Sequence, residues 1–345
     1  MTMPWRPAAA TGVGSMPGTS AREAARIVAG ELPDLVHVVE LPDRGPGSDM
    51  IGRTGAMLTQ VESRFGLETT PDGWRIAGAG SRQMRLAHAY LGEDLDAMEE
   101  STAEYAGPVK VQMVGPLTFA AAVELRSGER ALRDPGAMRD IAEALALAAG
   151  EQVGDIRRRV PHASSVLIQW DEPGLPAVLE GRIGTASGLS SYAPVDPQQA
   201  ERLLATVLAA SGDTVSGVHC CAEAPPVDLL RSAGASFVSI DITALADASD
   251  QAVGRLLESG GGLLAGCVPT VGARRLSDTA ASASVRALLH RLGLEDDRHL
   301  AGVAISPTCG LAGASPAWAR AALEACAAVG RVLRQDETGG AVDGQ

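Results

Sequence analysis

Side chains that can bind a metal ion stand at the ends of apolar segments that lie far apart in the sequence. His219 and Cys221 end one such segment, and Cys309 follows another much later in the chain. Because side chains alternate along a strand, His219 and Cys221 are expected on one face and Cys220 on the other. Imidazole nitrogen and thiolate sulfur are ligands that zinc prefers. The pattern therefore predicts a zinc site whose ligands come from separate strands, although packing is the competing interpretation for each residue alone.

The fourth ligand of a tetrahedral site has two candidates. Asp241 ends a third apolar segment and would complete the set, although Asp is also a favoured helix cap. Cys267, near the end of a further segment, is the alternative ligand. Cys326 lies among apolar residues of a helical segment and is predicted to belong to the core.

Two carboxylates and a short turn stand at comparable positions. Glu40 and Asp171 each end an apolar segment, and Gly14 and Ser15 follow the first one. A carboxylate at such a position either lines a pocket or forms a surface ion pair. Likewise, Gly14 either brings backbone close to a ligand or only makes a turn.

The elements that must position these residues form a repeated pattern. Eight short apolar segments are typical of buried parallel strands, and segments with helical spacing separate most of them. This order predicts an α/β fold, a closed (β/α)8 TIM barrel, in which the carboxyl ends of the strands line one pocket. A doubly wound sheet is disfavoured because no GxGxxG motif follows a strand. The predicted strands are Ala10–Gly14, Leu35–Glu40, Val109–Val114, Ser165–Asp171, Val215–Cys220, Ser236–Asp241, Gly262–Val268 and Ala301–Ser306. The predicted helices are Ser20–Gly30, Gly136–Arg158, Pro197–Ala210, Pro226–Ala233, Asp250–Ser259, Leu276–Leu292 and Pro316–Leu333.

One long segment, residues 41–108, interrupts the pattern after the second strand. It is expected to hold helices over Asp49–Val61 and Ser81–Tyr90 and a tight turn at Thr70–Trp74. An insertion after a barrel strand lies at the active-site end, so it should form one wall of the pocket. Residues 1–345 are predicted to form a single domain, with a frayed tail over residues 335–345.

Composition excludes several classes of protein. The 345 residues are 46% hydrophobic and 21% charged, as in an ordinary globular enzyme. No apolar run is long enough to span a membrane, and the start has no export signal, so a cytoplasmic location is expected. The net charge of −13 argues against a nucleic-acid partner, which would need clustered basic residues. Five cysteines in such a chain are expected as thiols or metal ligands rather than disulfides.

Taken in order, these motifs resemble the C-terminal, zinc-binding catalytic domain of cobalamin-independent methionine synthase. The resemblance runs from Gly12 to about Arg334 and lacks the family's separate N-terminal half, as expected of a short, core-type member. The motifs that carry it are Val13-Gly-Ser-Met-Pro17, Asp72-Gly-Trp74, Gly80-Ser-Arg82, Val114-Gly-Pro-Leu-Thr118, Ile168-Gln-Trp-Asp-Glu-Pro173, His219-Cys-Cys221, Val238-Ser-Ile-Asp241 and Pro307-Thr-Cys-Gly-Leu311.

The resemblance implies zinc-dependent transfer of a methyl group to the thiol of homocysteine, giving methionine. His219, Cys221 and Cys309 match zinc ligands, and Asp241 stands where the family has Glu. The amino-acid part of homocysteine would be held by Val13, Gly14, Ser15, Glu40 and Asp171, the last two with a catalytic, orienting role. Arg82 and Gln83 match a folate-contact site.

Departures from the family concentrate on the side of the methyl donor. Ala122 stands where the family has a folate-stacking Trp, the loop after Pro173 is shortened, and Val271-Gly-Ala-Arg-Arg275 stands where a proton-donating His is expected. The donor is therefore either methyltetrahydrofolate or a methylcorrinoid, the latter with a corrinoid protein as partner. A zinc thiol alkyltransferase with another acceptor, and a non-catalytic zinc- or amino-acid-binding homologue, are the alternatives. A metal-free decarboxylase of a related barrel would leave the His and Cys residues unexplained.

Overall fold

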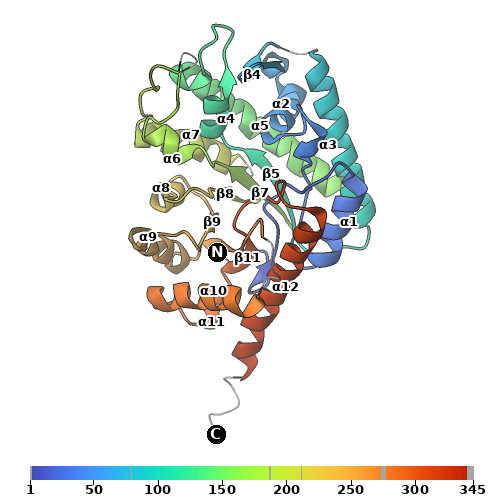
Figure 1. Cartoon of the computed structure of the whole chain (residues 1–345), viewed down its shortest axis with the longest axis vertical. Helices are drawn as coiled ribbons and strands as arrows, with labels where there is room; N and C mark the ends of the chain where they lie inside the picture. The colour runs from blue at the N-terminus through green and yellow to red at the C-terminus, as the bar shows by residue number, and fades with distance from the viewer. Residues whose placement is uncertain (1, 79, 186–187, 211, 273–276, 340–345) are drawn as a thin grey trace.

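The centre of the molecule is a parallel eight-stranded sheet (Figure 1). The computed structural model describes the chain except for residues 1, 79, 186–187, 211, 273–276 and 340–345. The strands are hydrogen-bonded in the order β1-β11-β10-β9-β8-β7-β5-β2, and all their pairings are parallel. Their bounds are β1 (Ala9–Ala10), β2 (Val36–His37), β5 (Val109–Val114), β7 (Val166–Asp171), β8 (Val215–His219), β9 (Phe237–Asp241), β10 (Gly262–Val268) and β11 (Val303–Pro307).

The two edges of this sheet meet just beyond β1 and β2. The Met16 amide donates to the Glu40 carbonyl at 2.8 Å, and the Glu40 amide donates to the Gly14 carbonyl at 3.2 Å. These bonds close the barrel at the carboxyl ends of its strands. Both strands are shorter than expected because buried side chains replace the ladder: Lys110 donates to the Val13 carbonyl and Gln112 to the Val38 carbonyl.

Eight helices follow the eight strands in turn, which confirms the predicted (β/α)8 architecture. Each covers the outer face of the sheet through apolar side chains, as a parallel sheet requires. Asp196 caps one of them and Pro197 begins it, as the start signal predicted. The helices are α1 (Ala21–Glu31), α3 (Arg82–Ser101), α5 (Pro135–Arg159), α7 (Pro197–Ala209), α8 (Val227–Ser232), α9 (Asp247–Glu258), α10 (Asp278–Leu292) and α12 (Pro316–Gly339).

Inside the barrel, an apolar layer lies below a polar one. At the amino end of the strands a small cluster packs around Trp5 and Phe237, whose rings meet edge to face at 5.7 Å. Side chains alternate along a strand, so the residues two positions further along each strand also face the inside of the barrel. Those with polar side chains are all buried: Thr11, His37, Lys110, Gln112, Gln169, Ser239 and Ser306. This polar layer lies between the apolar cluster and the carboxyl ends of the strands.

The segment after β2, residues 41–108, consists of an insertion followed by one helix of the barrel ring. It contains the short helix η1 (Pro42–Arg44), α2 (Met50–Val61), η2 (Ser63–Phe65) and a hairpin of β3 (Leu67–Thr70) and β4 (Gly73–Ile76). Strand β4 pairs with β6 (Val123–Glu124), which ties the hairpin to the loop after β5. Helix α3, predicted as part of the insertion, packs against α1 and belongs to the barrel ring.

The carboxyl-terminal helix differs from the expectation. Helix α12 continues to Gly339, five residues into the segment that was predicted to fray, and residues 340–345 lie outside the described part. The short helices α4 (Pro116–Ala122), α6 (Leu175–Leu179), α11 (Asp297–Leu300) and η3 (Ala131–Arg133) lie in the connections. Among the described helices, none has the length and apolar character needed to cross a membrane.

Candidate metal and amino-acid site

Three of the predicted metal ligands lie together at the carboxyl ends of the strands. His219 ends β8, Cys221 follows two residues later, and Cys309 follows β11. Their ligand atoms lie within 4.8 Å of one another. The Cys309 sulfur is 3.0 Å from the Cys221 sulfur and 3.8 Å from Nε2 of His219. Cys220 is fully buried and is not one of the three, as the alternation of strand side chains predicted.

Ser239 on the neighbouring strand orients the imidazole. Nδ1 of His219 lies 2.9 Å from the Ser239 hydroxyl, so Nε2 is the nitrogen that faces the two sulfurs. A hydrogen bond on one ring nitrogen commonly fixes the tautomer of a metal-binding histidine, which leaves the other nitrogen free as the ligand. Sequence reasoning missed Ser239, although it lies two residues before Asp241 and on the same face of β9.

The two thiols are joined by a hydrogen bond. Cys221 donates its thiol to Cys309, and this bond, with His219 nearby, lowers the pKa of Cys309 to about 4. The same bond raises the pKa of Cys221. A buried imidazole nitrogen and two half-buried sulfurs at these separations, close to one another, are a donor set that fits zinc.

The two candidates for a fourth ligand lie outside this group. The Asp241 carboxylate accepts hydrogen bonds from the amide and the hydroxyl of Thr243, at 2.8 and 2.6 Å. It therefore shapes the turn after β9 and does not cap α9, whose N-cap residue is Ala246, so the helix-capping role weighed for it from the sequence is wrong. Cys267 is buried in the apolar core. Among the described residues the group thus has three ligands, the number typical of zinc sites that leave one position for a substrate.

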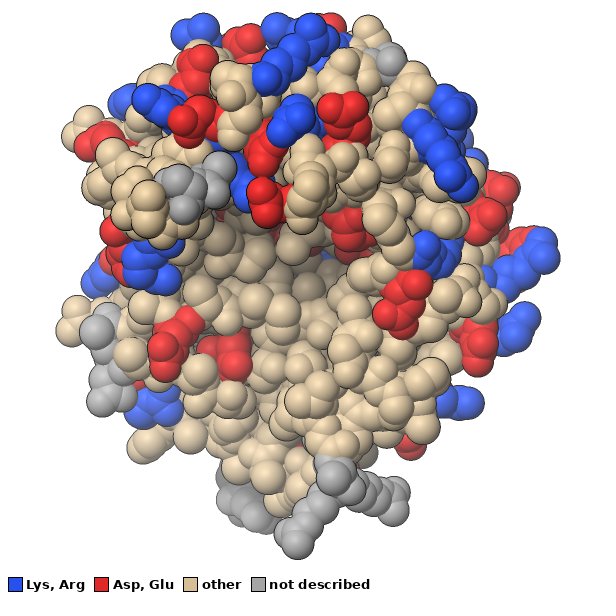
Figure 2. Space-filling model, turned by 45° about the horizontal axis from the view of Figure 1, so that its top comes forward, with Lys and Arg blue, Asp and Glu red and all other residues tan. Residues whose placement is uncertain are grey.

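A cavity of about 450 Å³ opens beside the three ligands. Figure 2, which turns the end carrying α2 and β4 toward the viewer, shows a hollow bordered largely by uncharged side chains. The insertion supplies one wall, as predicted, through Pro42 and the start of α2. The lining residues are Val13, Gly14, Ser15, Glu40, Pro42, Asp49, Met50, Ile51, Asp171, Pro173, His219, Cys221, Cys309 and Gly310. All five positions expected to hold an amino acid are thus in one cavity with the three ligands.

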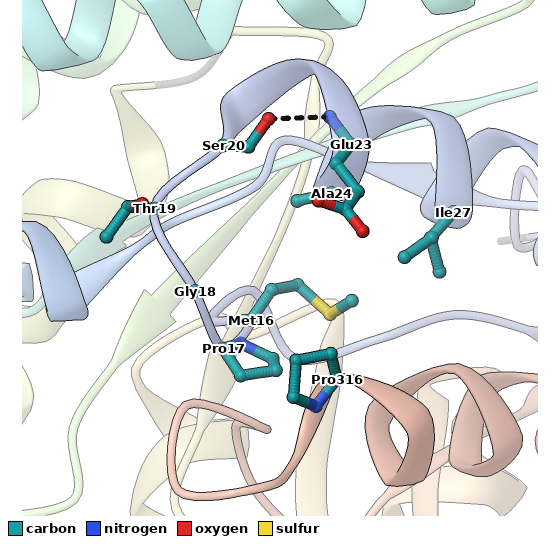
Figure 3. Close-up of a pocket in the computed structure, with 9 residues that line it drawn as sticks. All are labelled: Met16, Pro17, Gly18, Thr19, Ser20, Glu23, Ala24, Ile27 and Pro316. Carbon is teal, nitrogen blue, oxygen red and sulfur yellow. Dashed lines mark hydrogen bonds between the residues drawn. The ribbon is translucent and has the colours of Figure 1, made fainter.

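The turn after β1 is held tightly against the loop after β11. The Leu311 amide donates to the Ser15 carbonyl at 2.8 Å, and a Cβ on Gly310 would lie 2.1 Å from the Ser15 hydroxyl. Behind this turn is a second cavity of only about 50 Å³, between the start of α1 and Pro316 (Figure 3). There the Ser20 hydroxyl caps α1 by accepting from the Glu23 amide at 3.3 Å. This small cavity is far below the usual size of a ligand site.

Two buried carboxylates face the cavity. Burial raises the pKa of Glu40 to about 7, against the lowering effect of Arg53. Burial also raises the pKa of Asp171, while His219 and a 2.7 Å hydrogen bond from Gln169 act in the other direction. A cationic group entering the cavity would stabilise both carboxylates in their charged forms.

A buried chain of charges, missed by sequence reasoning, supports Glu40. Nε of Arg53, on α2, lies 3.7 Å from the Glu40 carboxylate, and Nη1 forms an ion pair with Asp94 on α3. Arg44 contacts both Asp94 oxygens at 2.8 Å. These residues stand in helical segments, where a charge is ordinarily predicted to face solvent. The only sequence signal was that Arg53 lies within a run of apolar and small residues.

Glu172 explains why two of the motifs occur together. Its carboxylate accepts from the amides of Leu117 and Thr118, both at 2.8 Å, and from the Thr118 hydroxyl at 2.7 Å. Glu172 therefore caps the start of α4. A Cβ on Gly115 would lie 2.3 Å from this carboxylate, so the contact requires glycine. The Gly-Pro-Leu-Thr and Asp-Glu-Pro motifs are thus joined to each other through Glu172, next to Asp171 in the sequence.

The residues expected to contact folate do not line the cavity. Arg82 is exposed at the start of α3, and the Gln83 side chain donates to the Thr69 hydroxyl at 3.0 Å. Of the segment that replaces the family's His, residues 273–275 lie outside the described part of the chain.

The closed (β/α)8 barrel places a His/Cys/Cys group that could hold a metal ion, and two buried carboxylates, at the carboxyl ends of its strands, where barrel enzymes carry their active sites. Residues 87–331 match the catalytic domain of the cobalamin-independent synthase family, and the chain belongs to that family. This membership supports a methyltransferase role. No curated protein matches the chain.

Two solved structures share the fold at low sequence identity. A B12-independent methionine synthase from Shewanella sp. W3-18-1, in complex with selenomethionine, is 14% identical with a TM-score of 0.61. The match covers 96% of this chain and 99% of that one. A methyltransferase from Methanosarcina mazei is 13% identical with a TM-score of 0.51, and the match covers 95% and 94% of the two chains.

Proposed function

We propose that this protein is a zinc-dependent methyltransferase that transfers a methyl group to the thiol of homocysteine and so makes methionine. The observation that carries the proposal is the shared cavity of the His219, Cys221 and Cys309 group and the two buried carboxylates. One part of the cavity suits a metal-bound thiol, and the other suits the ammonium group of an amino acid.

Different site residues bind the two ends of the substrate. A zinc ion held by His219, Cys221 and Cys309 would convert the bound thiol to a thiolate, which is the nucleophilic form. Glu40 and Asp171 bind and orient the ammonium group, and backbone groups around Ser15 receive the carboxylate. Holding the substrate at both ends places its sulfur for in-line attack on the methyl group, and such placement supplies a large part of the rate.

The donor is proposed as methyltetrahydrofolate or a methylcorrinoid. Arg82 and Gln83 lie away from the cavity, and Ala122 offers no ring on which a pterin could stack. These features favour the methylcorrinoid, delivered by a corrinoid protein. A methylcorrinoid also needs no proton donor, because its cobalt is a leaving group that does not have to be protonated. A cytoplasmic location suits an enzyme whose five cysteines are all free thiols.

The test is turnover by zinc-loaded protein with homocysteine and each donor in separate reactions. Methionine formation with either donor supports the proposal, and the donor that works identifies the partner. A protein that binds zinc but makes no methionine with either donor would contradict it. Methylation of other thiols in the same assay would instead favour an alkyltransferase with another acceptor. Binding of homocysteine without turnover would favour a non-catalytic homologue.

A further inference from the structure

One basic residue of this chain differs from all the others. Of the 29 lysine and arginine residues, Lys110 is the only lysine. It is also fully buried, on β5 inside the barrel, whereas most arginines lie at least partly exposed. A chain that uses arginine for every other positive charge therefore carries its one lysine at the centre of the fold. Burying a charged group is costly unless it is paired and hydrogen-bonded, so its partners indicate what it does.

The partners of Lys110 belong to the cavity. Its Nζ donates to the Val13 carbonyl at 2.8 Å and lies 3.5 Å from the Gln112 side-chain oxygen. Val13 lines the cavity, and its carbonyl also accepts from Gln169 at 2.9 Å. Lys110 itself does not line the cavity, so it acts from beneath the floor.

The charges around Lys110 are those that the cavity would use. Glu40 and Asp171 both interact favourably with its ammonium group, which in turn favours their charged forms. The remaining titratable neighbour is His37 on β2, which burial and Lys110 keep neutral by lowering its pKa to about 3. Lys110 is thus the cation beneath a pair of buried carboxylates.

The chemistry of the position also explains why it is a lysine. An ammonium group is a compact charge on an unbranched stem, whereas a guanidinium is a planar fork with five donors. Inside the barrel the acceptors within reach of Nζ are the Val13 carbonyl and the Gln112 side chain. A guanidinium there would leave several donors buried without partners.

We propose that Lys110 is a positioning residue that fixes the Val13 carbonyl and supplies the countercharge that keeps Glu40 able to bind the ammonium group of an amino acid. This inference rests on the proposed function only for the identity of that amino acid. The charge arrangement itself can be tested on the protein without any donor.

The first test uses the single lysine as a spectroscopic probe. Labelling with [13C,15N]lysine gives one side-chain signal, whose pH titration reports Lys110 alone. Burial lowers the pKa of Lys110 to about 8, and Glu40 opposes this effect. We expect a midpoint near 8 in the unsubstituted protein and a lower midpoint in E40Q. E124Q, which removes a buried carboxylate outside the cavity, should leave the midpoint unchanged. A midpoint near the ordinary 10.5, or one that E40Q does not move, would overturn the proposal.

The second test measures homocysteine binding to zinc-loaded protein by calorimetry. K110M should weaken binding at neutral pH, by about tenfold for each unit by which the pKa of Glu40 rises when the ammonium group is lost. The weakening should diminish as the pH rises, because Glu40 then ionises without the help of Lys110. K110Q, which keeps a donor but no charge, should also weaken binding, whereas S306A, at another buried polar position of the barrel, should not. Equal affinity of K110M and the unsubstituted protein would refute the inference. Failure of the unsubstituted protein to bind homocysteine would refute the proposed function instead, and the lysine titration would still decide the role of Lys110.

Discussion

Substituting Arg53 by Met would remove the cation that joins Glu40 to Asp94. Breaking a buried ion pair by removal of one partner costs about 3–5 kcal/mol. Asp94 keeps its two contacts to Arg44, so we expect the lower end of this range, about 3 kcal/mol. For a chain of this size, that loss lowers the melting temperature by about 4 °C.

The pH dependence of this loss distinguishes an electrostatic cause from a packing defect. The pKa of Glu40 is raised from 4.5 to about 7, so the folded state holds a proton that the unfolded state releases. Stability due to Glu40 therefore falls as the pH rises from 4.5 to 7. Because Arg53 lowers this pKa, its removal raises the pKa further and extends the fall above pH 7.

Thermal unfolding followed by circular dichroism between pH 5 and 9 measures both effects. Arg53→Lys, which keeps a charge, should lose less stability than Arg53→Met. Arg22→Met, which breaks an exposed pair with Glu100, is the matched control and should leave the melting temperature unchanged. A melting temperature of Arg53→Met that equals the unsubstituted value, or a loss that does not vary with pH, would refute the reasoning.

Three further predictions concern the cavity. Cys309→Ser should abolish binding of zinc in a metal titration, while Cys220→Ala should retain it, because only the former sulfur faces the group; equal zinc content in both would contradict the assignment. Gly310→Ala should weaken homocysteine binding in calorimetry, because its Cβ would lie 2.1 Å from the Ser15 hydroxyl; unchanged affinity would show that this contact is dispensable. Homocysteine affinity should rise as the pH increases through about 7, where Glu40 loses its proton, and a flat pH profile would count against its role.

The sequence was sufficient to predict the barrel and, to within one residue, the carboxyl ends of six of its eight strands, β1 and β2 being the exceptions. Each strand is a short apolar run followed by a segment with helical spacing, so the local pattern and the global fold agree. Alternation along β8 separated Cys220 from His219 and Cys221, since a strand leaves only two faces for a side chain. Gly14, Ser15, Glu40 and Asp171 were likewise predicted from their positions at or just after strand ends, whereas Val13 was predicted from the family resemblance alone.

The parts that could not be predicted depend on contacts between distant segments. Whether Asp241 turns inward or bonds to Thr243 is decided by local hydrogen bonding that the pattern of apolar residues does not contain. Arg53 and Asp94 are buried because α2 and α3 pack against each other, whereas a charge in a helical segment is ordinarily predicted to face solvent. The lengths of β1 and β2 were overestimated because side chains from β5 replace their backbone ladder.

X-ray absorption at the zinc edge tests the central claim most directly. The zinc-loaded protein should show one nitrogen and two sulfur neighbours, at about 2.0 and 2.3 Å. Addition of homocysteine should raise the sulfur count by one, because the substrate thiol takes the position that the protein leaves open. A protein that binds no zinc, or a sulfur count that homocysteine does not change, would contradict the account.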